Sequence, residues 1–178
     1  EELEMKTVLL AASLAASWLV LQAPSTSTGP EIGKPAPSFR LNDQEGVAPP
    51  VRGKGEHWTV LAFYPKAMTS GCTVECQSLR DSANAFYSAG IQVFGLSLDS
   101  VVDQKAFHSA EELNFPLLSD PDGSVAAKYG VLMKDKPFTE RVTFAIDPAG
   151  VLRAVDREVD VANHGAEVIA LVEGLQKQ

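Results

Sequence analysis

The residues of this chain best suited to chemistry are two cysteines, the only ones among its 178 residues. Cys72 follows a continuous apolar, β-prone run, Trp58 to Tyr64, which ends at Pro65. From Cys72 onward the apolar residues recur at intervals of four and three, the period of one helix face. Cys72 is therefore expected in the first turn of a helix, where unpaired N–H groups and the positive end of the helix dipole favour a thiolate. Such a thiolate is a nucleophile suited to an electrophilic substrate.

Two neighbours extend this picture. Thr69, three residues before Cys72, is placed to turn its hydroxyl toward the sulfur. Cys76 lies one helical turn beyond Cys72 on the same apolar stripe. Free cysteine is among the most buried residue types. Cys76 is thus open to two interpretations, a second reactive thiol or an inert core residue.

The segment around Cys72 resembles a known family. Pro65-x-x-x-Thr69-x-x-Cys72 is similar to the active-site motif of the peroxiredoxins, and residues 63–81 (FYPKAMTSGCTVECQSLRD) resemble their Q-type, or bacterioferritin-comigratory, branch. The resemblance continues through residues 113–131 and 141–147. It implies a thioredoxin-like fold and a thioredoxin-dependent peroxidase of antioxidant defence that reduces hydrogen peroxide or alkyl hydroperoxides.

The resemblance also implies a role for each matching residue. Cys72 is the peroxidatic cysteine, Thr69 its hydroxyl partner, and Pro65 the shield of the pocket. Arg141 supplies a permanently charged guanidinium that stabilises the thiolate and the charge on the leaving oxygen. The implied partners are a hydroperoxide and a thioredoxin-like or other thiol reductant. No cofactor or metal is implied, and the protein is expected to be a monomer or a weak dimer.

One position departs from the family pattern. A resolving cysteine in this helix commonly follows the peroxidatic one by five residues, but that position is Gln77, and Cys76 comes at four. Residues four apart on a helix have Cβ atoms about 5–6 Å apart, whereas a disulfide needs about 3.5–4.5 Å. We therefore expect Cys76 to attack oxidised Cys72 only after the first turn unwinds. The competing hypothesis is a one-cysteine enzyme that an external thiol resolves.

Three other functions fit parts of the pattern less well. Cys72-x-x-x-Cys76 also resembles the copper chaperones of cytochrome oxidase assembly, whose paired thiolates suit Cu(I). Those proteins have Pro and His where this chain has Gln77 and Arg141. A thiol–disulfide oxidoreductase needs two cysteines separated by two residues. A binding module with a dead site has no reason to keep Thr69, Cys72 and Arg141 together.

Two further polar residues, Glu75 and His164, are not assigned a catalytic role. His164 is expected at the start of the last helix. Glu75 either hydrogen-bonds near the site or occupies a first-turn position that acids favour.

Strand-like and helix-like segments alternate along the domain before a hairpin and a closing helix. This order predicts an α/β fold, a mixed central sheet with helices on both faces. The expected strands are residues 58–64, 91–98, 116–118, 141–146 and 151–155, and the expected helices are residues 72–86 (with Gly90 as the cap), 101–113, 124–129 and 165–175.

Charge excludes one class of partner. The chain has 15 Lys and Arg against 23 Asp and Glu, for a net charge of −8. Nucleic-acid binding rests on clustered cations, so no nucleic-acid partner is expected. Three scattered histidines do not form a metal-ligand cluster.

The N-terminus has the pattern of a targeting segment. Met5-Lys6 precedes an uncharged apolar run, Thr7 to Leu21, which is shorter than the roughly 18–20 residues of a membrane-spanning helix. Residues 1–25 are interpreted as a signal peptide or an uncleaved N-terminal anchor, residues 26–37 as a linker, and residues 38–178 as the peroxiredoxin domain. The protein is then exported to the periplasm or secreted, free or tethered, in a compartment that permits disulfides.

Overall fold

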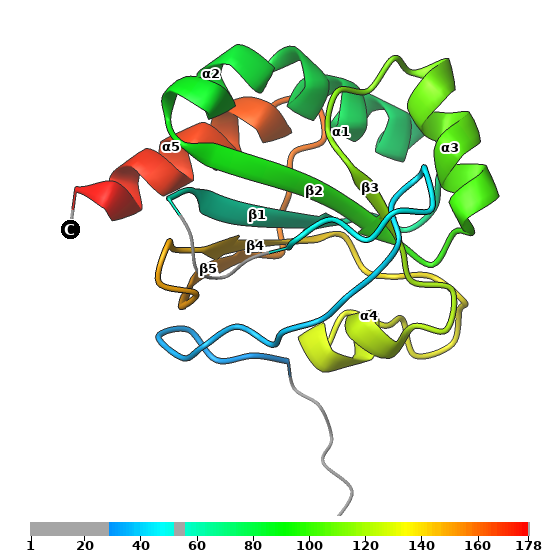
Figure 1. The fold of residues 1–178 in the computed structure, drawn as a ribbon, viewed down its shortest axis with the longest axis horizontal. Coiled ribbons are helices and arrows are strands. Elements are labelled where there is room, and N and C mark those ends of the chain that lie inside the picture. The colour runs from blue at the N-terminus through cyan, green and yellow to red at the C-terminus, as the bar shows by residue number, and fades with distance from the viewer. Residues whose placement is uncertain (1–28, 52–55, 178) are drawn as a thin grey trace, which may run out of the picture.

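The computed structural model describes residues 29–51 and 56–177 of the chain. Within them one five-stranded sheet has the order β3-β2-β1-β4-β5 (Figure 1). β1, β2 and β3 are mutually parallel, β4 runs antiparallel to β1, and β5 forms the expected hairpin with β4. The strands are β1 Trp58–Phe63, β2 Ile91–Ser97, β3 Leu117–Ser119, β4 Val142–Ile146 and β5 Leu152–Asp156.

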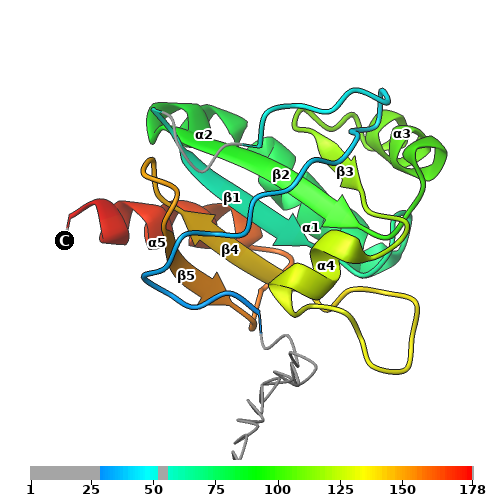
Figure 2. The same ribbon diagram turned by 60° about the horizontal axis from the view of Figure 1, so that its bottom comes forward.

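Helices cover both faces of the sheet, as expected. α1, α2, α3 and α5 lie on one face, and α4 lies on the other beside the N-terminal segment (Figure 2). This arrangement buries β1 completely, which explains its unbroken apolar sequence. The helices are α1 Ser70–Asp81, α2 Ala83–Ser88, α3 Val101–Ala110, α4 Ser124–Tyr129 and α5 His164–Gln176.

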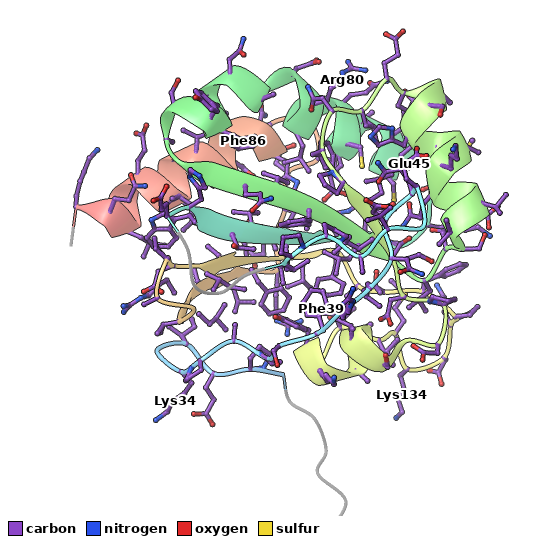
Figure 3. All side chains as sticks on the ribbon, viewed as in Figure 1. Lys34, Phe39, Glu45, Arg80, Phe86 and Lys134 are labelled. Carbon is purple, nitrogen blue, oxygen red and sulfur yellow. The ribbon has the colours of Figure 1, made fainter. Side chains whose placement is uncertain are left out.

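Alternation along the strands divides the core into two halves. Val60 and Ala62 of β1 face α1 and α5, whereas Leu61 and Phe63 face α4. In Figure 3, Phe39 of the N-terminal segment lies on the α4 side of the sheet. Cys72 and Cys76 both belong to the half beneath α1 and α5, so the chemistry is built against that face.

The helix expected over residues 72–86 is in fact two helices. Its stripe of apolar residues continues through Phe86, but the backbone breaks at Ser82 (φ −90°, ψ 3°). The Ser82 hydroxyl donates to the carbonyl of Ser78 at 2.9 Å, and such local bonds compete with helix continuation. Periodicity alone could not show the break because α2 packs its apolar side on the same sheet. Gly90 follows α2 in the left-handed region (φ 66°), as its predicted role as a cap requires.

Part of the segment expected as a linker, residues 26–37, forms hydrogen bonds at the start of β5. The N–H of Gly33 donates to the carbonyl of Leu152 at 2.8 Å, and that of Ala36 to Gly150 at 2.9 Å. Residues 33–36, assigned to the linker, therefore pair with the start of β5. The expected signal segment, residues 1–25, lies outside the described residues. Among the helices of the described part, none is long and apolar enough to cross a membrane.

Candidate active site

Cys72 occupies the first turn of α1, as the sequence predicts. Thr69 precedes the helix in extended conformation, and its carbonyl accepts the N–H of Thr73 at 2.8 Å. The N–H of Cys72 therefore belongs to the opening turn, whose amides have no acceptor within the helix. Cys72 is only 1% exposed. Its sulfur is thus held in a largely dry environment at the positive end of a helix.

The loop that starts α1 is fixed from β2. Asp99, two residues beyond that strand, accepts the N–H of Ala67 at 2.8 Å and the hydroxyl of Ser97 at 2.7 Å. Met68 then turns the chain into the helix at φ 62°, an uncommon conformation for a residue with a side chain. Strain of this kind persists where surrounding contacts impose it. The position of Cys72 is therefore set by contacts that come from the neighbouring strand.

Arg141 approaches the sulfur from the sheet. It directly precedes β4, which pairs with β1, and its Nη2 lies 3.5 Å from Cys72 Sγ. Its Nη1 forms an ion pair with Glu75, which is 1% exposed. The guanidinium is thus held between the carboxylate of Glu75 and the sulfur of Cys72. The structure therefore brings together Cys72 and Arg141, which lie 69 residues apart in sequence.

Behind Arg141 lies a polar chain that sequence reasoning did not assemble. Glu75 Oε1 is 3.1 Å from His164 Nδ1, and His164 Nε2 is 2.8 Å from the hydroxyl of Thr143. Burial lowers the pKa of His164 to about 4. The sequence spacing indicates part of this cluster. Glu75 follows Cys72 by three residues and so lies on the same helix face, and Arg141 and Thr143, two residues apart in extended chain, share one side of the sheet. The approach of α5, which carries His164, had no sequence signal.

Thr69 and Pro65 lie beside the site but make other contacts. Thr69 is exposed, and its hydroxyl donates to the carbonyl of Lys66 at 2.9 Å, so it is not directed at the sulfur. Pro65 is half-buried and lines a cavity of about 380 Å³ together with Asp99. Cys72 does not line that cavity.

Cys76 lies on the inner side of α1 and is a free thiol, as is Cys72. It is 1% exposed. Burial raises the pKa of Cys76, and the nearby Cys72 and Glu111 raise it further. In the intact helix Cys76 is therefore a thiol and a poor nucleophile.

Among residues 29–51 and 56–177, no group of three or more His, Cys, Asp and Glu side chains is arranged to hold a metal ion. The comparisons with known proteins that follow likewise give nothing in favour of a copper chaperone.

Those comparisons agree with the geometry. The model of the AhpC/TSA family matches residues 32–155. A protein named putative peroxiredoxin bcp, from Coxiella burnetii, is 39% identical over 145 residues, which cover 78% of this chain and 96% of that protein. Peroxiredoxin Bcp of Escherichia coli is 36% identical over 140 residues, covering 75% of this chain and 90% of the relative.

Solved structures give the same result. The crystal structure of peroxidoxin BcpB from Mycobacterium tuberculosis superposes with a TM-score of 0.74 at 33% identity, covering 81% of this chain and 97% of that one. The bacterioferritin comigratory protein of Xanthomonas campestris gives 0.71 at 30% identity, covering 88% and 98%. The expected thioredoxin-like fold is confirmed. The chain therefore belongs to the AhpC/TSA family, in the Bcp branch of the peroxiredoxins, and it is a thiol-dependent peroxidase.

Proposed function

We propose that Cys72 is the peroxidatic cysteine of this enzyme. The observation that carries the proposal is the 3.5 Å contact between Arg141 Nη2 and Cys72 Sγ in the first turn of α1. A cation and a helix N-terminus on one buried sulfur stabilise the thiolate, which is the reactive form of cysteine. Cys76, on the same helix, lacks this arrangement.

In the proposed reaction the Cys72 thiolate attacks the distal oxygen of a hydroperoxide. An S–O bond forms while the O–O bond breaks, so the sulfur is oxidised by two electrons to sulfenic acid and the peroxide is reduced. Hydroxide or alkoxide leaves and takes up a proton from solvent. The guanidinium of Arg141 and the N–H of Cys72 are the donors placed to stabilise that developing negative charge. The structure of the Xanthomonas campestris relative was described for its alkyl peroxide reduction activity, which supports alkyl hydroperoxides as substrates here.

We propose that Cys76 resolves the sulfenic acid. Its thiolate attacks Cys72 sulfur, a disulfide forms, and hydroxide leaves to become water. An intact α1 holds Cys76 as a buried thiol with a raised pKa. Unwinding of the first turn would both free the thiol to ionise and let the two sulfurs meet. A thioredoxin-like or other dithiol then reduces the disulfide by exchange.

Intact-mass measurement tests both parts of the proposal. The reduced protein receives one equivalent of hydrogen peroxide, with Cys72→Ser and Cys76→Ser variants in parallel. A loss of about 2 Da in the wild type identifies the Cys72–Cys76 disulfide. A gain of about 16 or 32 Da on Cys72 in the wild type indicates a one-cysteine cycle and rejects Cys76 as the resolving thiol. Oxidation of the Cys72→Ser variant at the wild-type rate would reject Cys72 as the peroxidatic residue.

We also propose that the enzyme works after export, on the strength of the uncharged run Thr7 to Leu21 after Met5-Lys6. Expression of the full chain in a bacterium, followed by fractionation and N-terminal sequencing, tests this. A periplasmic product that begins near Thr26 is the expected result. An intact N-terminus in the cytoplasmic fraction would reject it.

A further inference from the structure

The polar chain behind Arg141 is almost entirely withdrawn from water. Thr143 and Glu75 are each 1% exposed, and His164 is fully buried. These residues come from three separate elements, β4, α1 and the start of α5. Buried polar groups cost stability unless each finds a partner. Here Thr143 hydrogen-bonds His164, His164 and Arg141 face the two oxygens of Glu75 within ion-pair distance, and Arg141 contacts the sulfur of Cys72.

The chemistry of the partners fixes the imidazole of His164 in one tautomer. Glu75 is ion-paired with Arg141, so its carboxylate only accepts hydrogen bonds. His164 Nδ1 faces Glu75 Oε1 at 3.1 Å, so Nδ1 is the nitrogen that carries the proton in the neutral ring. The free lone pair on Nε2 then accepts the Thr143 hydroxyl at 2.8 Å. Each carboxylate oxygen of Glu75 consequently faces one nitrogen, Nδ1 of His164 on one side and Nη1 of Arg141 on the other.

Arg141 needs such support because its guanidinium makes two contacts at once. Its Nη1 faces Glu75 while its Nη2 faces Cys72 Sγ. An arginine side chain loses rotamer entropy when it is fixed. A carboxylate held rigidly in place directs the guanidinium, whereas a mobile one would let it swing away from the sulfur.

We propose that His164 is a positioning residue of the peroxidase, which acts on the reacting sulfur through Glu75 and Arg141. This inference rests on the proposed role of Cys72. His164 touches neither Cys72 nor the site of attack, so its whole effect passes through the orientation of Arg141. The outer residue of the chain, Thr143, supports the same orientation by fixing the imidazole.

The charge of His164 agrees with this role. The charged groups that face it are Glu75 on α1, Arg141 before β4, Asp156 of β5 and Glu167 of α5. Burial outweighs the nearby acids and lowers the pKa of His164 to about 4. At neutral pH the imidazole is therefore uncharged, and Glu75 keeps Arg141 as its only cationic partner.

A double-mutant cycle tests the proposal, with the second-order rate of Cys72 oxidation by hydrogen peroxide as the readout. His164→Leu removes the donor with an apolar side chain of similar size, and it is combined with Arg141→Met. We expect His164→Leu to slow oxidation by about tenfold when Arg141 is present and by less than about twofold when it is absent. His164→Asn, which retains an N–H near the position of Nδ1, should recover most of the rate.

A matched control separates positioning from general support of α5. Val168 lies on the same helix, is 3% exposed and contacts the core instead of the polar chain. Val168→Ala should lower the unfolding midpoint and leave the oxidation rate unchanged. An equal loss of rate in Val168→Ala and His164→Leu, or an equal effect of His164→Leu with and without Arg141, would overturn the proposal.

Two further outcomes are distinguishable. A wild-type protein that does not react with peroxide rejects the proposed function itself, whereas normal rates in both wild type and His164→Leu reject only the positioning role. Should His164→Leu fail to fold, Thr143→Val in the same cycle decides. A loss of oxidation rate of about threefold that occurs only when Arg141 is present supports the proposal, and an unchanged rate overturns it.

Discussion

Cys72 and Cys76 lie one turn apart on α1 and are equally buried, each 1% exposed. Their surroundings nonetheless differ in charge. Cys72 has a guanidinium nitrogen at 3.5 Å, whereas burial and acidic neighbours raise the pKa of Cys76. Exposure alone therefore does not distinguish the two cysteines, whereas the charged groups near each sulfur do.

The difference comes from where each turn of α1 meets the sheet. Arg141, which directly precedes β4, places its charge beside Cys72 in the first turn and is paired there with Glu75. The second turn lies over the interior of the sheet, among buried apolar side chains and close to Tyr64. One helix therefore places a cysteine beside a cation at its start and a buried thiol one turn later.

Serine substitution of each cysteine gives the sharpest test of this contrast. Cys72→Ser should lower the rate of peroxide consumption by about 10³-fold or more, because the nucleophile is lost. Cys76→Ser should leave the first oxidation within about twofold, because that thiol plays no part in the attack. Stopped-flow measurement on the reduced proteins resolves this first step. Similar losses of oxidation rate in the two variants would contradict this difference between the two cysteines.

Removing the cation should make the surroundings of Cys72 like those of Cys76. Arg141→Met retains much of the side-chain length but no charge, and we expect the oxidation rate to fall by about 10²-fold. Arg141→Lys should recover only part of it, since a single ammonium cannot contact Glu75 and Cys72 together as the guanidinium does. Second-order rates measured over a peroxide series check both values. A wild-type rate in Arg141→Met would show that the helix N-terminus alone activates the thiol.

Much of this site could be predicted from sequence, for reasons that particular residues make clear. Cys72 follows a buried strand and opens an apolar stripe of helical period, so local pattern places it at a helix start. Arg141 came only from the family resemblance, since no local pattern joins residues 69 positions apart. Thr69 was placed near the sulfur by spacing, but spacing does not fix a hydroxyl rotamer, and the hydroxyl bonds Lys66 instead.

The parts that sequence did not yield depend on packing between distant elements. His164 sits at the start of the last helix, as expected, but its role depends on α5 lying against α1 and β4. Glu75 looked like an ordinary acid of a first helical turn until the structure showed it buried between Arg141 and His164. The break at Ser82 escaped the periodicity because the apolar side chains continue across it.

Acid should destabilise the polar surroundings of Cys72 through His164. Its pKa of about 4 in the folded state lies below the ordinary value of 6.5. The unfolded chain therefore binds a proton that the folded chain does not, and stability present above pH 6.5 is lost as the pH falls toward 4. Glu75, Arg141, Asp156 and Glu167 face this imidazole. We expect a contribution of about 3 kcal/mol at neutral pH.

Urea unfolding of wild type and His164→Asn at several pH values measures this contribution. Other carboxylates titrate in both proteins, so the informative quantity is the difference between the two free energies of unfolding. That difference should shift by about 3 kcal/mol against the wild type between pH 7 and pH 4. Parallel curves would mean that His164 titrates alike in the folded and unfolded chain, contrary to its burial.

The smallest expected effects come from two glycines of α5, one of which packs against the second half of α1. Gly165 of α5 donates its N–H to the Ser78 hydroxyl at 3.1 Å. A Cβ there would lie 2.5 Å from the Ser78 carbonyl oxygen and 2.1 Å from the Ser82 hydroxyl. Gly165→Ala should therefore cost about 1–3 kcal/mol of stability. Gly174, on the same helix, has no heavy atom within 4 Å of such a Cβ, so Gly174→Ala should add about 0.5–1 kcal/mol.

The same two variants also test how well the fold protects Cys76. The folded protein is treated with an alkylating agent, and the modification of Cys76 is measured by peptide mass spectrometry. Forcing α5 away from Ser78 loosens the part of α1 that keeps this thiol buried, so Gly165→Ala should speed alkylation of Cys76. Gly174→Ala, which adds only helix propensity, should not. Equal alkylation in the two variants would show that α5 does not hold Cys76 in place. The protection of that thiol would then reside within α1 and the sheet beneath it.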